Sequence, residues 1–254
     1  MHIREQAFVV VGGSSGLGAA CVRRMSDAGA VGIVADLQPP ADSSTTDAAA
    51  RFVFHQTDVT DEASVQQMLT LAENRFGLVR GVVVCAGIIH GELIIGADGP
   101  GDLAAFRRVI EVNLMGTFNV MRLAGDTMRN NPPNDEGERG VIITTSSIAA
   151  TDGQIGQTAY AASKGGVASL TLPAARELGR FGIRVVCIAP GVFETPMIQQ
   201  VSEKSRQSLA SQIPFPPRFG HPEEFAALVQ HIAENPMLNG TVIRLDGGLR
   251  MGPR

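Results

Sequence analysis

The sequence predicts an α/β fold in which helices cover both faces of a parallel β-sheet. Short runs that are apolar almost throughout alternate with longer segments of helical periodicity, and a glycine-rich turn joins the first run to the first helix. Strands without polar positions are typical of parallel sheets that are buried on both faces. The repeated strand–helix order therefore predicts a doubly wound parallel sheet of about seven strands with right-handed crossovers.

The predicted strands are short apolar runs of residues that favour extended structure. They are Ala7–Val11, Val31–Ala35, Phe52–His55, Val82–Cys85, Val141–Thr145, Arg184–Ile188 and Thr241–Leu245. The predicted helices are Gly16–Gly29, Glu62–Phe76, Asp102–Arg129, Thr158–Gly179 and Pro222–Glu234. Pro173 lies inside the fourth helix, and we expect it to kink that helix or to remove one of its hydrogen bonds.

A single domain is predicted for residues 1–254, because neither an internal repeat nor a linker divides the chain. The long connection at 191–220 contains four prolines around a predicted helix at Val201–Ala210. This connection follows a strand at the edge of the sheet where ligands bind, and such a position predicts a substrate lid.

The composition argues against several classes of protein. Hydrophobic residues make up 44% of the chain, enough for a buried core, and the net charge of −4 argues against a nucleic-acid-binding surface. No run approaches the ~18 apolar residues of a membrane span. The three cysteines lie scattered in apolar stretches, which indicates free thiols, and the histidines show no metal-ligand spacing. Because the first strand begins by Ala7, we expect no signal peptide and a cytoplasmic protein.

The turn after the first predicted strand contains Gly12, Gly16 and Gly18. Glycine permits a tight turn and a close approach of the backbone to a pyrophosphate, while the following helix offers free N–H groups and a positive dipole end. A glycine-rich turn alone is weak evidence, but this one stands between a strand and a helix. The arrangement predicts a Rossmann-type site for a dinucleotide.

Asp36 ends the second predicted strand, about 20 residues after the turn. A carboxylate there binds ribose hydroxyls and repels a 2′-phosphate, which favours NAD over NADP, although a simple turn residue is the alternative. Two more segments follow predicted strands. Asp58-Val59 could frame the adenine, and Cys85-Ala86-Gly87 would lie along the ribose.

Tyr160 is the only tyrosine in the chain and precedes Lys164 by four residues. A phenol is a poor base at neutral pH, but an ammonium on the same helical face favours the phenolate and brings its pKa toward working pH. Ser147, at the end of the preceding strand, could hold the oxygen of a substrate. The pattern predicts acid–base chemistry between alcohols and ketones, whereas a lone tyrosine is more often a packing residue.

With these motifs the chain resembles the short-chain dehydrogenases/reductases over essentially its whole length. The matching residues are Gly12, Gly16, Gly18, Asp58-Val59, Cys85-Ala86-Gly87, Asn113, Ser147, Tyr160, Lys164 and Pro190-Gly191. The resemblance implies that Tyr160 accepts the hydroxyl proton, that Lys164 lowers its pKa and holds the nicotinamide ribose, and that Ser147 stabilises the oxyanion. It also implies that Asn113 binds a water linking Lys164 to solvent, where the alternative is an ordinary helical asparagine.

Longer segments resemble the type-2 3-hydroxyacyl-CoA dehydrogenase branch of that family (17β-hydroxysteroid dehydrogenase type 10-like). They are Val112–Val120, Gly153–Gln157, Ala189–Pro196 and Ile243–Gly248. The resemblance implies NAD-dependent oxidation of 3-hydroxyacyl-CoA, including 2-methyl-branched short chains, with tolerance of hydroxysteroids in many members. By the same resemblance the coenzyme contacts Ser15, Leu17, Asp36, Asp58, Val59, Cys85, Tyr160, Lys164, Phe193 and Thr195. A homotetramer is implied as well, with subunit contacts on the helical segments around Asn113 and Tyr160.

The substrate side is left open by the residues themselves. Gln157 or Gln154 could hydrogen-bond a thioester carbonyl, although a surface role fits equally well. The segment Ile88–Gly101, a candidate substrate wall, departs from the branch. The candidate apolar side chains for an acyl or steroid pocket are Phe193, Met197, Ile198, Phe215 and Phe219.

Three alternative functions remain open. A hydroxysteroid dehydrogenase or a 3-oxoacyl reductase would use the same chemistry. Asp36 argues against the reductase, because biosynthetic reduction usually draws on NADPH. The third alternative is a non-catalytic NAD-binding scaffold on the same fold. The presence of all four catalytic-type residues (Asn113, Ser147, Tyr160 and Lys164) argues against that alternative.

Overall fold

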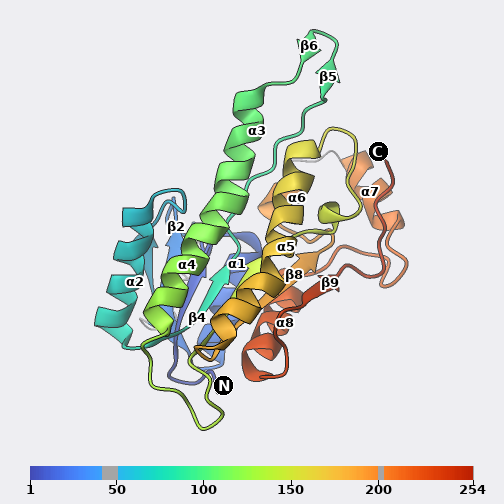
Figure 1. The fold of residues 1–254 in the computed structure, drawn as a ribbon. Helices are drawn as coiled ribbons and strands as arrows, with labels where there is room; N and C mark the ends of the chain where they lie inside the picture. Colours follow the sequence, from blue (N-terminus) through green and yellow to red (C-terminus); the bar gives the residue numbers. More distant parts are fainter. Residues whose placement is uncertain (42–50, 200–202, 254) are drawn as a thin grey trace.

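Seven parallel strands form one central sheet across residues 1–41, 51–199 and 203–253, which this computed structural model describes. Their order is β3-β2-β1-β4-β7-β8-β9, and helices cover both faces of the sheet (Figure 1). The predicted doubly wound α/β fold is therefore confirmed. The strands are β1 (Ala7–Val11), β2 (Val31–Asp36), β3 (Phe52–Gln56), β4 (Val79–Val84), β7 (Gly140–Thr145), β8 (Ile183–Pro190) and β9 (Val242–Leu245).

The direction of the strand order reverses at β1, which pairs with β2 on one side and with β4 on the other. The chain first moves outward from β1 to β3 and then returns to continue from β4 to β9. Loops that leave the carboxyl ends of β1 and β4 therefore diverge. Such a switch point opens a crevice where α/β sheets bind ligands.

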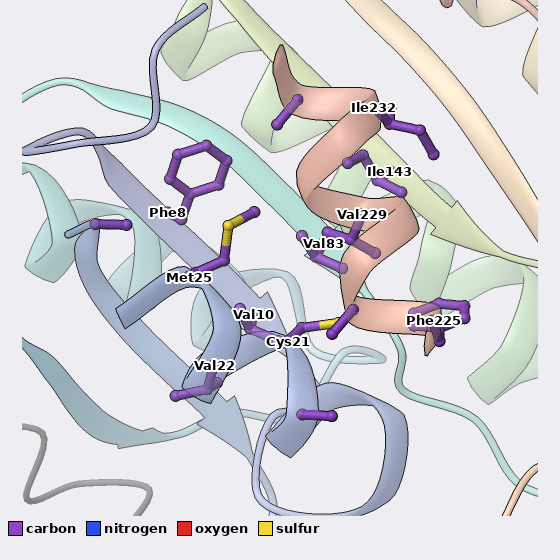
Figure 2. Close-up of a cluster of buried hydrophobic side chains, with 14 of the residues drawn as sticks. Phe8, Val10, Cys21, Val22, Met25, Val83, Ile143, Phe225, Val229 and Ile232 are labelled. Carbon is purple, nitrogen blue, oxygen red and sulfur yellow. The ribbon is translucent and has the colours of Figure 1, made fainter. Parts of the chain in front are cut away.

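The two faces of the sheet pack against different sets of helices. On one face, α1 (Gly16–Asp27) and α8 (Pro222–Glu234) meet over Phe8 and Val10 of β1, as Figure 2 shows. On the other face, Val9 and Val11 of β1 pack under α2 (Glu62–Phe76), α4 (Gly116–Met128) and α5 (Thr158–Gly179). This alternation follows from the pleat of a strand, which points successive side chains to opposite faces.

The third helical segment differs from its prediction as one regular helix, Asp102–Arg129. It consists of α3 (Leu103–Ile110), a π-helical turn at Glu111–Met115 and α4. The extra residue of a π-turn shifts the register of side chains on either side of it. By contrast, α5 continues through Pro173 to Gly179, so the proline does not end that helix.

Two connections surround the carboxyl edge of the sheet. A short hairpin of β5 (Ile95–Gly96) and β6 (Gly99–Pro100) precedes α3 and projects away from the sheet (Figure 1). The predicted lid contains α6 (Pro196–Gln199) and α7 (Glu203–Ser211). Of the helix predicted at Val201–Ala210, residues 201 and 202 lie outside the described residues, and the rest is part of α7. No helix in the described ranges is long and apolar enough to cross a membrane.

A buried ion pair lies at the opposite edge of the sheet, where β8 meets the end of α8. The Arg184 guanidinium lies 2.7 Å from the Glu138 carboxylate, and both side chains are at most 7% exposed. Arg184 also donates to the backbone carbonyls of Ile232, Ala233 and Leu238 at 2.8–2.9 Å. The cation therefore satisfies carbonyls at the carboxyl end of α8, where the helix dipole also favours positive charge.

Replacing this arginine should cost much of the stability of the fold. We expect Arg184→Met to lower the free energy of unfolding by about 3–5 kcal/mol, because the buried Glu138 carboxylate would keep only the Met1 ammonium as a partner and three backbone carbonyls would lose their donor. Chemical denaturation would measure the loss. As a control, Arg23→Met removes an exposed pair with Glu223 and should cost less than about 1 kcal/mol. Equal effects of the two substitutions would contradict this account.

Candidate active site

A cavity of about 660 Å³ opens at the carboxyl edge of the sheet. It is lined by residues that directly follow β1, β2, β4, β7 and β8, together with part of α5 and the lid. Every predicted coenzyme residue contributes to its wall, as do Ser147 and Gln157, and Asn113 lies behind the wall, fully buried. The predicted residues on the wall are Gly12, Ser15, Gly16, Leu17, Gly18, Asp36, Asp58, Val59, Cys85, Ala86, Gly87, Ser147, Gln157, Tyr160, Lys164, Pro190, Gly191, Phe193 and Thr195.

The glycine turn needs its glycines because backbones approach one another closely. Gly12 has φ +77°, and a Cβ there would overlap the backbone of Ala86. A Cβ on Gly18 would overlap the Gly12 carbonyl. The N-cap of α1, Ser15, makes no side-chain capping hydrogen bond, so its hydroxyl does not occupy the first N–H groups of the helix. The turn therefore fits a pyrophosphate.

Asp36 is held at the end of β2 by backbone donors. Its Oδ2 accepts from the Ser14 N–H at 3.1 Å, and its Oδ1 accepts from the Leu37 N–H at 2.8 Å. These bonds orient the carboxylate at the edge of the cavity beside the glycine turn, where a ribose hydroxyl can donate to it.

Tyr160 and Ser147 meet at the wall of the cavity. Burial raises the pKa of the Tyr160 phenol above its usual value, and a hydrogen bond with Ser147 partly lowers it again. Ser147 caps a short 3₁₀ turn (Ile148–Ala150), and its Oγ accepts from the Ala149 N–H at 3.1 Å. That bond uses an oxygen lone pair, so the hydroxyl hydrogen of Ser147 can donate either to Tyr160 or to a substrate oxygen.

Lys164 is buried beside the tyrosine. Its ammonium donates to the Thr145 carbonyl at 2.8 Å and lies 5.8 Å from the centroid of the Tyr160 ring. Burial lowers the pKa of Lys164 to about 8, while the Cys187 and Cys85 thiols act in the opposite direction. Burial dominates the pKa of the Tyr160 phenol, and the expected lowering of that pKa by Lys164 stays a prediction.

Asn113 lies in the π-turn and joins three segments. Its Oδ1 accepts from the Ile88 N–H at 2.8 Å, and its Nδ2 donates to the Ile88 carbonyl at 2.9 Å and to Ser163 Oγ at 3.0 Å. The Thr117 hydroxyl donates to the Asn113 carbonyl at 2.7 Å. The side chain thus fixes the loop after β4 against α5, next to the lysine. The predicted water link to Lys164 stays a prediction.

The substrate side of the cavity differs in part from its prediction. Ile198 and Phe193 lie on its wall, whereas Phe215 is 79% exposed and Phe219 packs in a buried cluster behind it. The side chain of Met197 lies outside what the structure describes. Of the segment Ile88–Gly101 only Ile88 and Ile89 reach the wall; Glu92 pairs with Gln157, and the strands β5 and β6 form the projecting hairpin.

Sequence reasoning missed several residues of the site. Thr145 holds the lysine through a backbone carbonyl, which no side-chain pattern reveals. Leu209 of α7 and Met251 near the C-terminus also line the cavity. The apolar spacing of the lid helix could have indicated Leu209, but Met251 carried no signal in the sequence.

Comparison with known proteins gives a consistent result. A family profile described as short chain dehydrogenase matches residues 6–206. The 3-hydroxyacyl-CoA dehydrogenase type-2 of Homo sapiens is 49% identical over 99% of this chain and 97% of its own length. The Drosophila melanogaster protein of the same name is 47% identical over 99% of this chain and 100% of its own. A crystal structure of 3-hydroxyacyl-CoA dehydrogenase type-2 from Mycobacterium avium superimposes with a TM-score of 0.93 at 42% identity, covering 98% of this chain and 97% of the other.

Removal of the phenol hydroxyl should abolish most of the activity on alcohols. We expect Tyr160→Phe to lower turnover about 10²–10⁴-fold, because the variant lacks the hydroxyl that we predict to take the proton. Coenzyme titration and thermal unfolding should show that binding and folding persist. Thr158→Ala, an exposed change on the same helix, is the matched control and should keep its turnover. Near-normal turnover of Tyr160→Phe would refute the assignment.

The pH dependence of the two reaction directions should be opposite. Tyr160 must be deprotonated to accept a proton, and burial raises its pKa, so alcohol oxidation should become faster as pH rises. Ketone reduction needs the protonated phenol and should slow down as the pH approaches the phenol pKa. Initial rates at saturating coenzyme from about pH 6 to about pH 10 would test both slopes. Oxidation that slows with rising pH, in a protein that stays folded, would contradict this assignment.

Proposed function

The chain belongs to the short-chain dehydrogenase family, and from that premise we propose that it oxidises 3-hydroxyacyl-CoA to 3-oxoacyl-CoA with NAD. The membership makes it an oxidoreductase acting on CH–OH groups with a nicotinamide nucleotide. One observation carries the proposal: Ser147, Tyr160 and Lys164 line the same cavity as the glycine turn and Asp36. A proton acceptor and a dinucleotide site therefore share one enclosed space.

The residues of this chain manage the substrate oxygen and its proton. A bound nicotinamide supplies the hydride acceptor, and in its oxidised form it adds positive charge to the cavity. Tyr160 accepts the proton of the substrate hydroxyl group as a hydride leaves the carbon that bears this group. Ser147 donates a hydrogen bond to that oxygen and stabilises its negative charge. Lys164 holds a ribose hydroxyl and keeps a positive charge near the phenol, which favours the phenolate once the coenzyme is bound.

Two features favour NAD over NADP. Asp36 presents a carboxylate where a 2′-phosphate would lie, and two negative charges at this distance repel one another. The segment that follows, 37–50, contains no Lys or Arg that could neutralise such a phosphate. We therefore assign the coenzyme as NAD(H).

The substrate class rests on the wall opposite the coenzyme and on the relatives. Ile198, Leu209 and Phe193 supply an apolar surface that suits an acyl chain. Gln157 lies on the same wall, three residues before Tyr160, and its amide, which also donates to Gln154, is the candidate partner for a thioester carbonyl. Relatives at 47–49% identity over nearly the whole chain are 3-hydroxyacyl-CoA dehydrogenases by name. The same apolar wall suits a steroid, so a hydroxysteroid dehydrogenase is the second candidate.

A homotetramer accounts for exposed apolar side chains on the long helices. Leu103 and Phe106 of α3, Met115 of the π-turn and Phe118 of α4 are 37–59% exposed. Such a row on one helical face is typical of a surface covered by another subunit. We infer that these helices pair with those of a second copy.

A substrate panel tests the proposed function. Reduction of NAD and of NADP would be followed spectroscopically with short and 2-methyl-branched 3-hydroxyacyl-CoAs and with 3- and 17-hydroxysteroids. We expect NAD-dependent turnover of the acyl-CoAs, with kcat/KM at least about tenfold lower for NADP because of the repulsion at Asp36. Turnover of steroids alone would move the substrate class, and coenzyme binding without any turnover would support the scaffold alternative.

A further inference from the structure

The chain after β9 turns back and runs along the substrate side of the cavity. Gly247 and Gly248 make this reversal with φ values of +62° and +81°. Residues that carry a side chain rarely adopt this backbone conformation. A Cβ on Gly247 would come within 2.7 Å of Ile213, which leaves no room for another residue. We refer to Leu249–Pro253 as the C-terminal strap.

An arginine fastens the start of the strap to the loop after the catalytic serine. Arg244 of β9 donates to the Leu249 carbonyl at 3.1 Å. The same guanidinium contacts Asp152 at 2.7 Å and Thr151 Oγ1 at 2.7 Å. Asp246 accepts from Arg244 at 2.8 Å and completes the network. The Arg244 guanidinium therefore joins the strap to the loop that follows Ser147, because it binds both at once.

A second set of bonds fastens the end of the strap. The Gln154 amide donates to the Gly252 carbonyl at 3.2 Å, and the Ile155 N–H donates to the Pro253 carbonyl at 3.0 Å. Gln154 in turn accepts from the Gln157 amide at 3.3 Å, so the strap connects to the glutamine one helical turn before Tyr160. Between the two sets of bonds, the strap has little freedom to move.

Met251 lies between these two anchors and lines the cavity. Its side chain is partly buried and packs with the cluster of Ile148, Phe219 and Leu249, of which Leu249 is fully buried. Ile148 directly follows Ser147, and Ile198 and Leu209 of the lid pack against the same cluster. Met251 therefore belongs to the substrate wall. Its unbranched, flexible side chain can fill the space beyond the end of a bound acyl chain.

We propose that the C-terminal strap forms the far wall of the acyl pocket and that Met251 determines which acyl lengths are accepted. This inference rests on the proposed function. The strap is held at both ends by hydrogen bonds, so a longer chain cannot simply push it aside. The methionine side chain occupies volume that additional methylene groups would need. Overfilling a packed apolar wall is unfavourable, and one methylene in such a pocket changes kcat/KM about 10- to 200-fold.

Truncation of Met251 should shift the substrate range toward longer chains. The ratio of kcat/KM for a long straight-chain 3-hydroxyacyl-CoA to that for a short one would be measured in wild type and in Met251→Ala. We expect the ratio to rise at least about tenfold, because the variant opens room for two or so methylene groups. Met237→Ala is the matched control, since Met237 is 88% exposed and lies outside the cavity wall, and its ratio should equal that of wild type.

A larger side chain tests the same inference in the opposite direction. Met251→Phe should lower the ratio, and thermal unfolding would identify any variant that has lost its fold. An unchanged ratio in folded Met251→Ala, or a shift in the same direction in both variants, would overturn the role of Met251 while leaving the proposed function intact. Wild-type protein that turns over no acyl-CoA of any length would overturn both.

Discussion

The close approach of β1 and β4 at the switch point is the constraint on which the site depends. The Val11 carbonyl accepts from the N–H groups of Cys85 and Ala86 at 2.7 and 3.1 Å, and Gly12 N–H donates to the Ala35 carbonyl at 2.7 Å. Three strand ends are thereby joined before the loops diverge. Only a residue without a side chain fits at Gly12 against Ala86, so the floor of the cavity consists of backbone. The shape of the coenzyme side of the site is therefore set by the hydrogen-bonded ends of these strands.

A buried lysine places a second demand on the fold. The ammonium of Lys164 needs a carbonyl acceptor, and the end of β7 provides one at Thr145. Gly87 leaves room for it, because a Cβ there would lie 3.3 Å from Nζ and 3.2 Å from Asn113 Oδ1. Asn113 reaches this position from a π-turn and fixes the Ile88 backbone on the other side. The irregular turn thus allows a helical segment with exposed apolar side chains to contribute Asn113 to the site.

The sequence predicts the sheet well because its strands are short, apolar and separated by clear turns. It also indicates many of the residues that the strand ends bring to the cavity, since those residues follow recognisable strands, although Thr145 was missed. Features that depend on distant contacts were missed. The π-turn around Asn113 has ordinary helical residues, and its extra residue accompanies bonds to Ile88 and Ser163. The pKa of Tyr160 depends on burial that spacing does not reveal, and Met251 reaches the cavity only through a reversal at two glycines.

The cavity is assembled from two kinds of wall, and this has a consequence for changing the substrate. The coenzyme half is continuous with the hydrogen-bonded sheet, where a change in one backbone position disturbs several strands. The proposed substrate half consists of the lid and the C-terminal strap, and the strap is fastened at its ends to Arg244 of β9 and to Gln154 in the loop after Ser147. Substitutions at Ile198, Leu209 or Met251 can therefore alter what is oxidised without altering how it is oxidised. The same chemistry could thus be given to a new substrate by changes in these peripheral segments alone, with the residues at the strand ends left as they are.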